Sequence, residues 1–264
     1  MEQRAGLRER KKNATWGLLR ATALEMFSER GYENVSVAEI AAAAEVSKAT
    51  VFNYFPTKED LVIGGMKAHT GDPAETVRTR PVGQTPHAAL RDRFLGLLEH
   101  HAPQTGLNDN PFFLKVQRLL HDNPALVVSS MNYRRQSAVL LAAVLVEEGN
   151  APLTSNLVSS QLLHTQQILI EVNARSMLEG ATPGEFYHRA VTGAKHAFGL
   201  LENGIGDLMR RGENDVAFAG EALGFSYERE VACAREQVEQ VERALGDTRD
   251  DLFEGLTDPD RLSR

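Results

Sequence analysis

Three helix-start signals fall within one stretch of 26 residues, and this crowding limits the fold more than any other feature of the chain. The signals are Ser36, Ser47 and Thr57, and an acidic residue stands three positions after the first and the third. A hydroxyl at such a position accepts a free backbone N–H of a helix N-terminus, and an acidic side chain three residues later returns the bond. The pattern predicts three consecutive helices, over residues 37–43, 48–53 and about 58–69.

The first two of these helices are too short to be stable alone and must be held by packing. Their apolar positions recur at helical spacing, so each helix has one buried face. Two short helices joined by the turn 44–46 have the proportions of a helix-turn-helix. Such a turn usually contains glycine, and Glu45 would cost about 1 kcal/mol if it took a positive φ there.

Charge is distributed unevenly along the chain. Residues 1–20 hold six basic and two acidic side chains, a balance of +4, whereas the whole chain carries a net charge of −7. A basic arm before a helix-turn-helix, on an acidic body, is the pattern of a protein that docks on DNA with one end. The alternative is a solvated, frayed N-terminus. The arm residues taken as DNA contacts are Arg10, Lys11 and Lys12.

Membrane and disulfide-stabilised classes are excluded by the sequence. The longest apolar run is the nine residues 138–146, well short of the ~18 to 20 that a membrane span needs. No apolar segment typical of a secretory signal follows the charged N-terminus. Cys233 is the only cysteine, which suits a reducing cytoplasm. We expect a cytoplasmic protein without a cofactor or a bound metal.

Nearly the whole sequence has helical periodicity, and alternating strand patterns are absent. A helix over residues 8–30 is the expected scaffold of the helix-turn-helix. The proline- and glycine-containing segment between His69 and Pro86 is typical of a loop. Thr-Pro and Asn-Pro pairs then start further helices, because proline suits the first helical position after a capping side chain. These helices are expected over residues 86–101, 111–121, 124–148, 155–179 and 183–211.

The last two of these helices are predicted to form an antiparallel hairpin with apolar surface to spare. Such a hairpin can pair with a second copy in a four-helix interface, and burial within one chain is the alternative. Candidate interface residues are Leu163, Ile170, Ala194, Phe198, Leu201 and Ile205. A further helix is expected over 226–245, where apolar residues from Tyr227 to Leu245 follow a heptad spacing, before an acidic tail.

The segment from Leu18 to Leu61 resembles the DNA-binding domain of the TetR family of bacterial transcriptional regulators. The resemblance rests on the residues ATALEMFSERGYENVSVAEIAAAAEVSKATVFNYFPTKEDL, which follow the family order without gaps. It implies an all-α protein with three parts. These are a three-helix DNA-binding domain with its basic arm (1–66), a helical effector-binding and dimerisation domain (67–212), and a C-terminal extension with one helix (213–264).

The same resemblance implies which residues meet DNA. The helix that begins at Lys48 would enter the major groove, and small or polar side chains on it would read base edges. Two positions depart from the family pattern: Phe52 replaces a common Tyr and is expected to pack in the core, and Trp16 replaces a common Arg. The carried-over contacts are Ser36, Ser47, Lys48, Ala49, Thr50, Asn53, Tyr54 and Lys58.

The favoured function is a homodimeric repressor that leaves operator DNA when a largely apolar small molecule binds within the helices from about 86 to 200. One alternative is control by a protein partner through the heptad segment. A metal-binding bundle enzyme is a weaker one, because a di-metal bundle needs two Glu-x-x-His motifs and only Glu185 with His188 supplies one. Candidate polar groups of the effector pocket are His121, Tyr133, His164, Gln167, Glu171, Asn173, Arg175 and His196.

Overall fold

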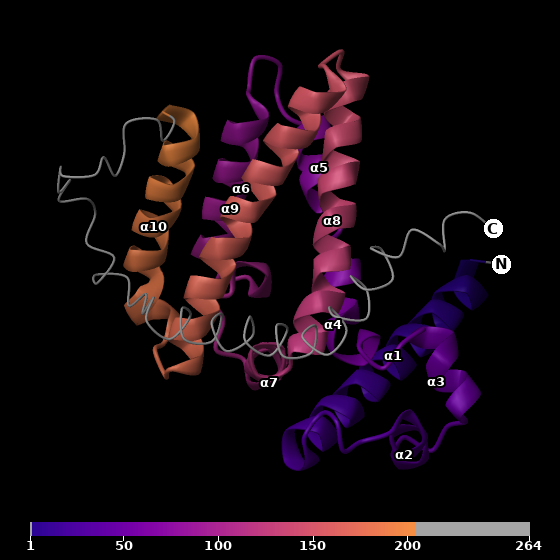
Figure 1. Cartoon of the computed structure of the whole chain (residues 1–264). Coiled ribbons are helices and arrows are strands. Elements are labelled where there is room, and N and C mark those ends of the chain that lie inside the picture. Colours follow the sequence, from indigo (N-terminus) through magenta and orange to yellow (C-terminus); the bar gives the residue numbers. More distant parts are fainter. Residues whose placement is uncertain (1, 204–264) are drawn as a thin grey trace, which may run out of the picture. The chain divides into compact units, whose positions relative to one another are not determined.

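The structure is a computed structural model that describes residues 2–203, with side chains from residue 10 to residue 202. All regular elements of this part are helices (Figure 1), which confirms the predicted all-α class. None of these helices is both long and apolar enough to cross a lipid bilayer. The heptad segment, Ile205 and the acidic tail lie outside the described residues. The elements are α1 (Glu2–Arg30), α2 (Val37–Ala43), α3 (Lys48–Tyr54), α4 (Asp60–Lys67), α5 (Asp72–Arg78), α6 (Pro86–Glu99), the 3-10 turn η1 (Pro103–Thr105), α7 (Pro111–Asp122), α8 (Pro124–Glu147), α9 (Pro152–Leu178) and α10 (Pro183–Asn203).

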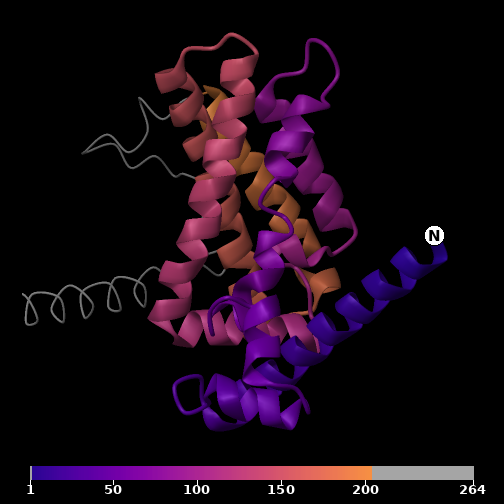
Figure 2. The same ribbon diagram turned by 90° about the vertical axis from the view of Figure 1, so that its right-hand side faces the viewer.

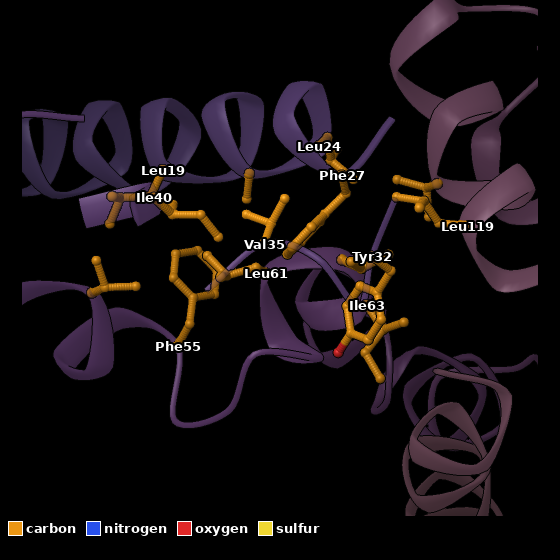
Figure 3. Packing of buried hydrophobic residues seen from close by; sticks show 14 of the residues in the cluster. Leu19, Leu24, Phe27, Tyr32, Val35, Ile40, Phe55, Leu61, Ile63 and Leu119 are labelled. Carbon is orange, nitrogen blue, oxygen red and sulfur yellow. The ribbon is translucent and has the colours of Figure 1, made fainter. Parts of the chain in front are cut away.

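Helices α1 to α4 share one apolar core (Figure 3). Leu19 and Phe27 of α1 are fully buried, and so are Ile40 of α2 and Phe55 after α3. Side chains of α7 and α8, among them Leu119, belong to the same cluster. The core therefore fixes α3 on α1, and it also joins the first four helices to the second half of the described chain.

The capping residues start the short helices as predicted. The Ser36 hydroxyl accepts the Glu39 N–H and the Glu39 carboxylate accepts the Ser36 N–H, which is a complete capping box. Ser47 accepts the Thr50 N–H at 3.0 Å. Thr57 and Asp60 make the same reciprocal pair, although the regular helix α4 begins only at Asp60. These local hydrogen bonds explain why three helices fit into so short a stretch.

The prediction of a loop between His69 and Pro86 is wrong in part, because this segment contains helix α5. Pro73 stands in the first turn, where its missing N–H costs nothing. Pro73, Ala74 and Val77 are buried, and α5 packs on α6 and α8. Tertiary burial here outweighs the turn-like composition, and the loop proper covers only the residues between α5 and α6.

Helices α6 to α10 surround a second core, in which α8 and α9 lie side by side as an antiparallel pair (Figures 1 and 2). Thr85 and Asn110 cap α6 and α7 as predicted. Asn123 does not cap α8, since its side chain donates to the Leu119 carbonyl instead. After η1, Gly106 has φ +74° and lies so close to α9 that a Cβ atom there would stand 2.2 Å from a backbone oxygen. Only glycine fits this contact.

Candidate nucleic-acid interface

Helix α3 presents one exposed face. Lys48, Ala49, Phe52 and Asn53 are exposed on it, whereas Val51 on the opposite side is 1% exposed and packs in the core. Residues at i, i+1, i+4 and i+5 share one side of a helix, so these four side chains form a continuous surface. A seven-residue helix with one face packed in the core and the other exposed has the form of a helix that reads a DNA groove.

Phe52 corrects the sequence interpretation, which assigned it to the core. The residue is 41% exposed, and the Lys48 ammonium lies 5.8 Å from its ring centroid. An aromatic ring under a lysine one turn away is a weak cation–π contact, which keeps the lysine over the exposed face. The exposed face of α3 therefore combines one cation, one amide and one aromatic ring.

The turn between α2 and α3 has the strained geometry expected of it. Glu45 has φ +55°, the left-handed conformation that favours glycine. The turn is closed by hydrogen bonds from the Val46 N–H to the Ala41 carbonyl at 2.9 Å and from the Glu45 N–H to the Ala42 carbonyl at 3.1 Å. The surrounding core holds this conformation at a cost of about 1 kcal/mol.

Ser36 was expected to contact DNA, but its hydroxyl and its N–H already bind Glu39. The Glu39 Oε2 atom accepts the Ser36 N–H at 2.8 Å and the hydroxyl at 2.7 Å. Arg30 donates to the other carboxylate oxygen at 2.5 Å, and this bond, followed by those from Ser36, lowers the pKa of Glu39 to about 2. A phosphate at this position would have to displace a carboxylate, so in this conformation Ser36 is a helix cap.

Lys58, another expected DNA contact, also has partners within the protein. Its ammonium donates to the Tyr32 carbonyl at 2.7 Å and lies 4.2 Å from the Tyr32 ring centroid. The Tyr32 hydroxyl in turn donates to Glu59, and burial together with this carboxylate raises the pKa of Tyr32. The residues that precede α4 are thereby tied to the end of α1. Two of the three ammonium protons of Lys58 are left for another acceptor.

The remaining predicted DNA contacts are distributed over α1 and the two ends of α3. The basic arm is part of α1, which begins at residue 2. Arg10, Lys11 and Lys12 are exposed on this helix. An open hollow lined by Lys12, Asn13, Trp16 and Gly17 lies on the same helix. Ser47 and Thr50 bind each other at the start of α3. Tyr54 at its end is half-buried against the core, so part of its ring serves packing.

A buried arginine on α1 joins this helix to α4 and α7, and nothing in the sequence analysis singled it out. Arg20 is 6% exposed, and its Nε and Nη2 atoms donate to the carbonyls of Leu61 and Val62 at 3.2 and 2.8 Å. Its guanidinium lies 4.8 Å from the Trp16 ring centroid and 5.0 Å from that of Phe112. Burial lowers the pKa of Arg20 to about 10, so the group remains charged at neutral pH.

A tyrosine on α8 makes a second connection to α4. The Tyr133 hydroxyl donates to Asp60 Oδ1 at 2.5 Å, and the other oxygen of the same carboxylate accepts the Thr57 N–H. Burial and the bond to Asp60 raise the pKa of Tyr133 to about 12. Lys115 of α7 is paired with Glu25 of α1. Helices α7 and α8 are therefore joined by side-chain contacts to α1 and to the start of α4.

The expected effector-pocket residues differ in their burial and in their partners. His121, His164, Glu171 and His196 are exposed. Tyr133 is bound to Asp60, and the buried Asn173 donates to the Thr105 carbonyl at 2.8 Å, so it holds η1 against α9. Gln167 donates to Glu171, which lies 3.6 Å from Arg134 on α8. Arg175 is half-buried in the last turn of α9. The grouping of these eight residues in a single site stays a prediction.

The expected dimer residues divide into two groups. Ala194 and Phe198 are 0% exposed and pack inside the chain, where Phe198 contacts the rings of His87 and Phe94 on α6. They are unavailable to a second copy in this conformation. Leu163, Ile170 and Leu201 are half-buried and belong to the second core.

The metal-site alternative gains no support from the described geometry. The Glu185 carboxylate accepts the N–H and the hydroxyl of Thr182, at 3.0 and 2.7 Å, and so caps α10. No group of three or more His, Cys, Asp or Glu side chains with metal-binding geometry occurs among the described residues.

Comparison with known proteins agrees with the geometry of the first four helices. Residues 19–63 match the family described as "Bacterial regulatory proteins, tetR family". The chain is 29% identical over 142 residues to the transcriptional regulator TcmR of Streptomyces glaucescens, a match that covers 53% of this chain and 62% of the relative. It is 62% identical over 40 residues to the regulator LuxR of Vibrio harveyi, covering 15% of this chain and 20% of LuxR. Among solved structures, NalD of Pseudomonas aeruginosa matches 70% of this chain and 97% of its own length at 15% identity, with a TM-score of 0.47.

Proposed function

This chain belongs to the TetR family of bacterial regulatory proteins, and we propose that it is a dimeric DNA-binding transcriptional regulator that a small molecule releases from its operator. The observation that carries the proposal is the exposed face of α3, with Lys48, Ala49, Phe52 and Asn53 on a helix whose other side is locked into the core. The relatives described above are transcriptional regulators and not enzymes.

Each group on α3 has a role that its chemistry suits. The Asn53 amide can bind adenine in a bidentate manner, which distinguishes the right base from a wrong one by ~1 to 3 kcal/mol. Ala49 and the Phe52 ring are apolar partners for thymine methyl groups. Lys48 supplies a cation for phosphate or guanine. The exposed Arg10, Lys11 and Lys12 on α1 add sequence-independent attraction to the backbone.

The proposed release from DNA depends on the contacts that join α7 and α8 to helices α1 to α4. A ligand among α6 to α10 that moves α7 or α8 also moves α4, because Tyr133 binds Asp60 and Arg20 joins α4 to α7. In a dimer this shift changes the spacing of the two α3 helices, which have to meet half-sites one helical turn, or a multiple of it, apart. A nearly complete switch requires a ligand that favours the released state by about 5.5 kcal/mol.

A gel-shift series on the DNA that flanks the protein's own coding region tests the proposal. The proteins compared are wild type, Asn53→Ala and Lys48→Ala, each at several salt concentrations. Asn53 and Lys48 are exposed, so their replacement leaves the core intact, unlike that of the half-buried Tyr54. The control is Lys195→Ala, which removes an exposed lysine from α10.

We expect Asn53→Ala to weaken specific binding by about 5- to 150-fold. If Lys48 contacts a phosphate, its removal lowers the slope of log affinity against log salt by about 1. Lys195→Ala should bind like wild type. Tight, specific binding that neither α3 variant weakens would show that another surface reads the DNA and would refute the assignment of α3.

A further inference from the structure

One side of α1 carries the same kinds of group as the exposed face of α3. An open hollow of ≈ 520 Å³ on α1 is lined by Lys12, Asn13, Trp16 and Gly17. These residues stand at i, i+1, i+4 and i+5, the spacing that also forms the exposed face of α3. Both faces combine a lysine, an aromatic ring four residues later and an asparagine amide. The face of α3 is assigned to DNA, whereas Asn13, Trp16 and Gly17 have no assigned role.

The two polar side chains of the hollow have no partners in the described part of the chain. Lys12 and Asn13 are exposed, and neither side chain makes a hydrogen bond or an ion pair with another described residue. Lys58 differs, since its ammonium donates to the Tyr32 carbonyl. All donors of Lys12 and Asn13 are therefore available to a group from outside this part of the chain.

Trp16 is the apolar component of the hollow, and its ring is held in place by neighbours. The Arg20 guanidinium lies 4.8 Å from the ring centroid, and the Phe55 ring centroid lies 5.8 Å from it. Arg20 is itself fixed by hydrogen bonds to the carbonyls of Leu61 and Val62. The Trp16 side chain is nevertheless only half-buried, so part of the ring is accessible. A ring that is already fixed loses little conformational entropy when a partner binds to it.

Gly17 leaves the space beside the ring empty. Glycine inside a helix is less favourable than alanine, so its presence there calls for a reason. Gly17 is not among the glycines with positive φ, and a Cβ atom added to it would meet no atom within 4 Å. The same holds for Gly96 on α6, so a bare glycine alone indicates no site. At residue 17, however, any side chain would take up part of the hollow.

We propose that the hollow on α1 holds the sugar–phosphate backbone of DNA beside the groove that α3 enters. Its place in the fold fits this role, because Trp16 packs on Phe55, the residue that ends α3. A helix in the major groove, which is about 12 Å wide, has a phosphate backbone along either side. The inference rests on the proposed function, since it requires α3 to bind DNA.

The chemistry of the hollow suits a DNA strand better than a small molecule. Lys12 and Asn13 donate to phosphate oxygens, and the Trp16 ring packs on a deoxyribose. The exposed Lys11 beside them adds positive charge that matches the strand. A small-molecule site normally encloses its ligand, whereas this hollow is open and its described lining comes from one helix. Contacts of this kind fix the orientation of α3 in the groove without reading sequence.

The fluorescence of Trp16 reports directly on the hollow, because it is the only tryptophan of the chain. The full chain is titrated at low salt with an end-labelled duplex of random sequence, since backbone contacts do not depend on sequence. Anisotropy of the label measures affinity, and quenching by acrylamide measures the accessibility of Trp16. The test variant is Gly17→Leu, which fills the hollow. Gly96→Leu is the matched control, a half-buried glycine of α6 that also borders open space.

We expect saturating duplex to shield Trp16 of the wild type from acrylamide. Gly17→Leu should bind the duplex about 10-fold more weakly, which is the loss of one charge-assisted hydrogen bond. Its stability in urea should equal or exceed that of wild type, because leucine is the better helix former. Weaker binding by a more stable protein separates a lost contact from a damaged fold. Gly96→Leu should bind like wild type, and Lys12→Ala should lower the slope of log affinity against log salt by about 1.

Two results would overturn the proposal and leave the proposed function intact. One is a bound duplex that leaves Trp16 as accessible to acrylamide as in the free protein. The other is a Gly17→Leu variant whose affinity equals that of wild type or of Gly96→Leu. A wild-type chain that binds no duplex even at low salt would instead refute the proposed function, and this inference with it.

Discussion

Replacing Tyr133 with phenylalanine removes one hydroxyl and with it the hydrogen bond between α8 and the first residue of α4. The two oxygens are 2.5 Å apart and the acceptor is the carboxylate of Asp60, so the bond is of the charge-assisted kind, which contributes about 1.5 to 3 kcal/mol. Tyr133 is only half-buried, and water replaces part of the lost bond. We expect Tyr133→Phe to lower the free energy of unfolding by about 1 to 2 kcal/mol.

Urea unfolding followed by circular dichroism measures this loss. Tyr187→Phe is the matched control, because Tyr187 is also half-buried on a helix and its hydroxyl makes no hydrogen bond among the described side chains. The control should change the unfolding free energy by less than about 0.5 kcal/mol. Equal effects of the two substitutions would refute the argument that the bond to Asp60 holds α8 against α4.

The same bond makes stability depend on alkaline pH. The pKa of Tyr133 is raised to about 12 in the folded protein, by burial first and by Asp60 second, against about 10 for an unfolded tyrosine. A group whose pKa is raised on folding contributes stability below its unfolded pKa and loses it as the pH rises through the folded one. Wild type should therefore lose stability more steeply than Tyr133→Phe between about pH 10 and 12.

Three further predictions concern the backbone and the caps. Gly106→Ala should lower the free energy of unfolding in urea by about 3 kcal/mol or more, because the added methyl meets a carbonyl of α9 at 2.2 Å. Gly83→Ala, at φ +88° in open space, should lower it by only about 1 to 2 kcal/mol. Glu45→Gly should raise the unfolding free energy by about 0.5 to 1 kcal/mol, since relief of the positive φ outweighs the extra freedom of the unfolded chain. The Glu39 carboxylate should titrate near pH 2 by NMR, keeping its stabilising bonds above the ordinary pKa and losing them as the pH falls through about 2. Arg30→Ala should raise the midpoint of this titration. An unchanged midpoint would exclude Arg30 as the main cause of the lowered pKa.

The reading domain was largely predictable because its signals are local. A capping hydroxyl and the acidic residue three positions later determine a helix start through hydrogen bonds within one turn. The predicted and observed bounds of α2 are the same, and α3 differs by one residue. The positive φ of Glu45 followed from the helix-turn-helix geometry. Such features depend on neighbours in sequence, and a single chain contains all the information they need.

The sequence did not allow the same prediction of which side of each helix is buried, or of which residues distant in sequence are in contact. A seven-residue helix has only two turns, so its periodicity did not reveal that Phe52 is exposed while Val51 is buried. The helices of the second half bury more than one side, which leaves the direction of a polar residue such as Asn173 undetermined until its partner η1 is placed. Arg20 was overlooked because an arginine in an amphipathic helix ordinarily faces solvent.

In the proposed mechanism, the contacts that the sequence did not reveal are the ones that couple the two halves. Tyr133 contributes about 1 to 2 kcal/mol through Asp60, and each bond of the Arg20 guanidinium to a carbonyl of α4 belongs to the class worth about 1.5 to 3 kcal/mol. A ligand that rearranged these contacts would change the energy balance by several kcal/mol, the same order as the ~5.5 kcal/mol needed for a full switch. In this proposal, contacts of this strength keep helices α1 to α4 in place for DNA binding, and a ligand among α6 to α10 has to offset them to release the DNA.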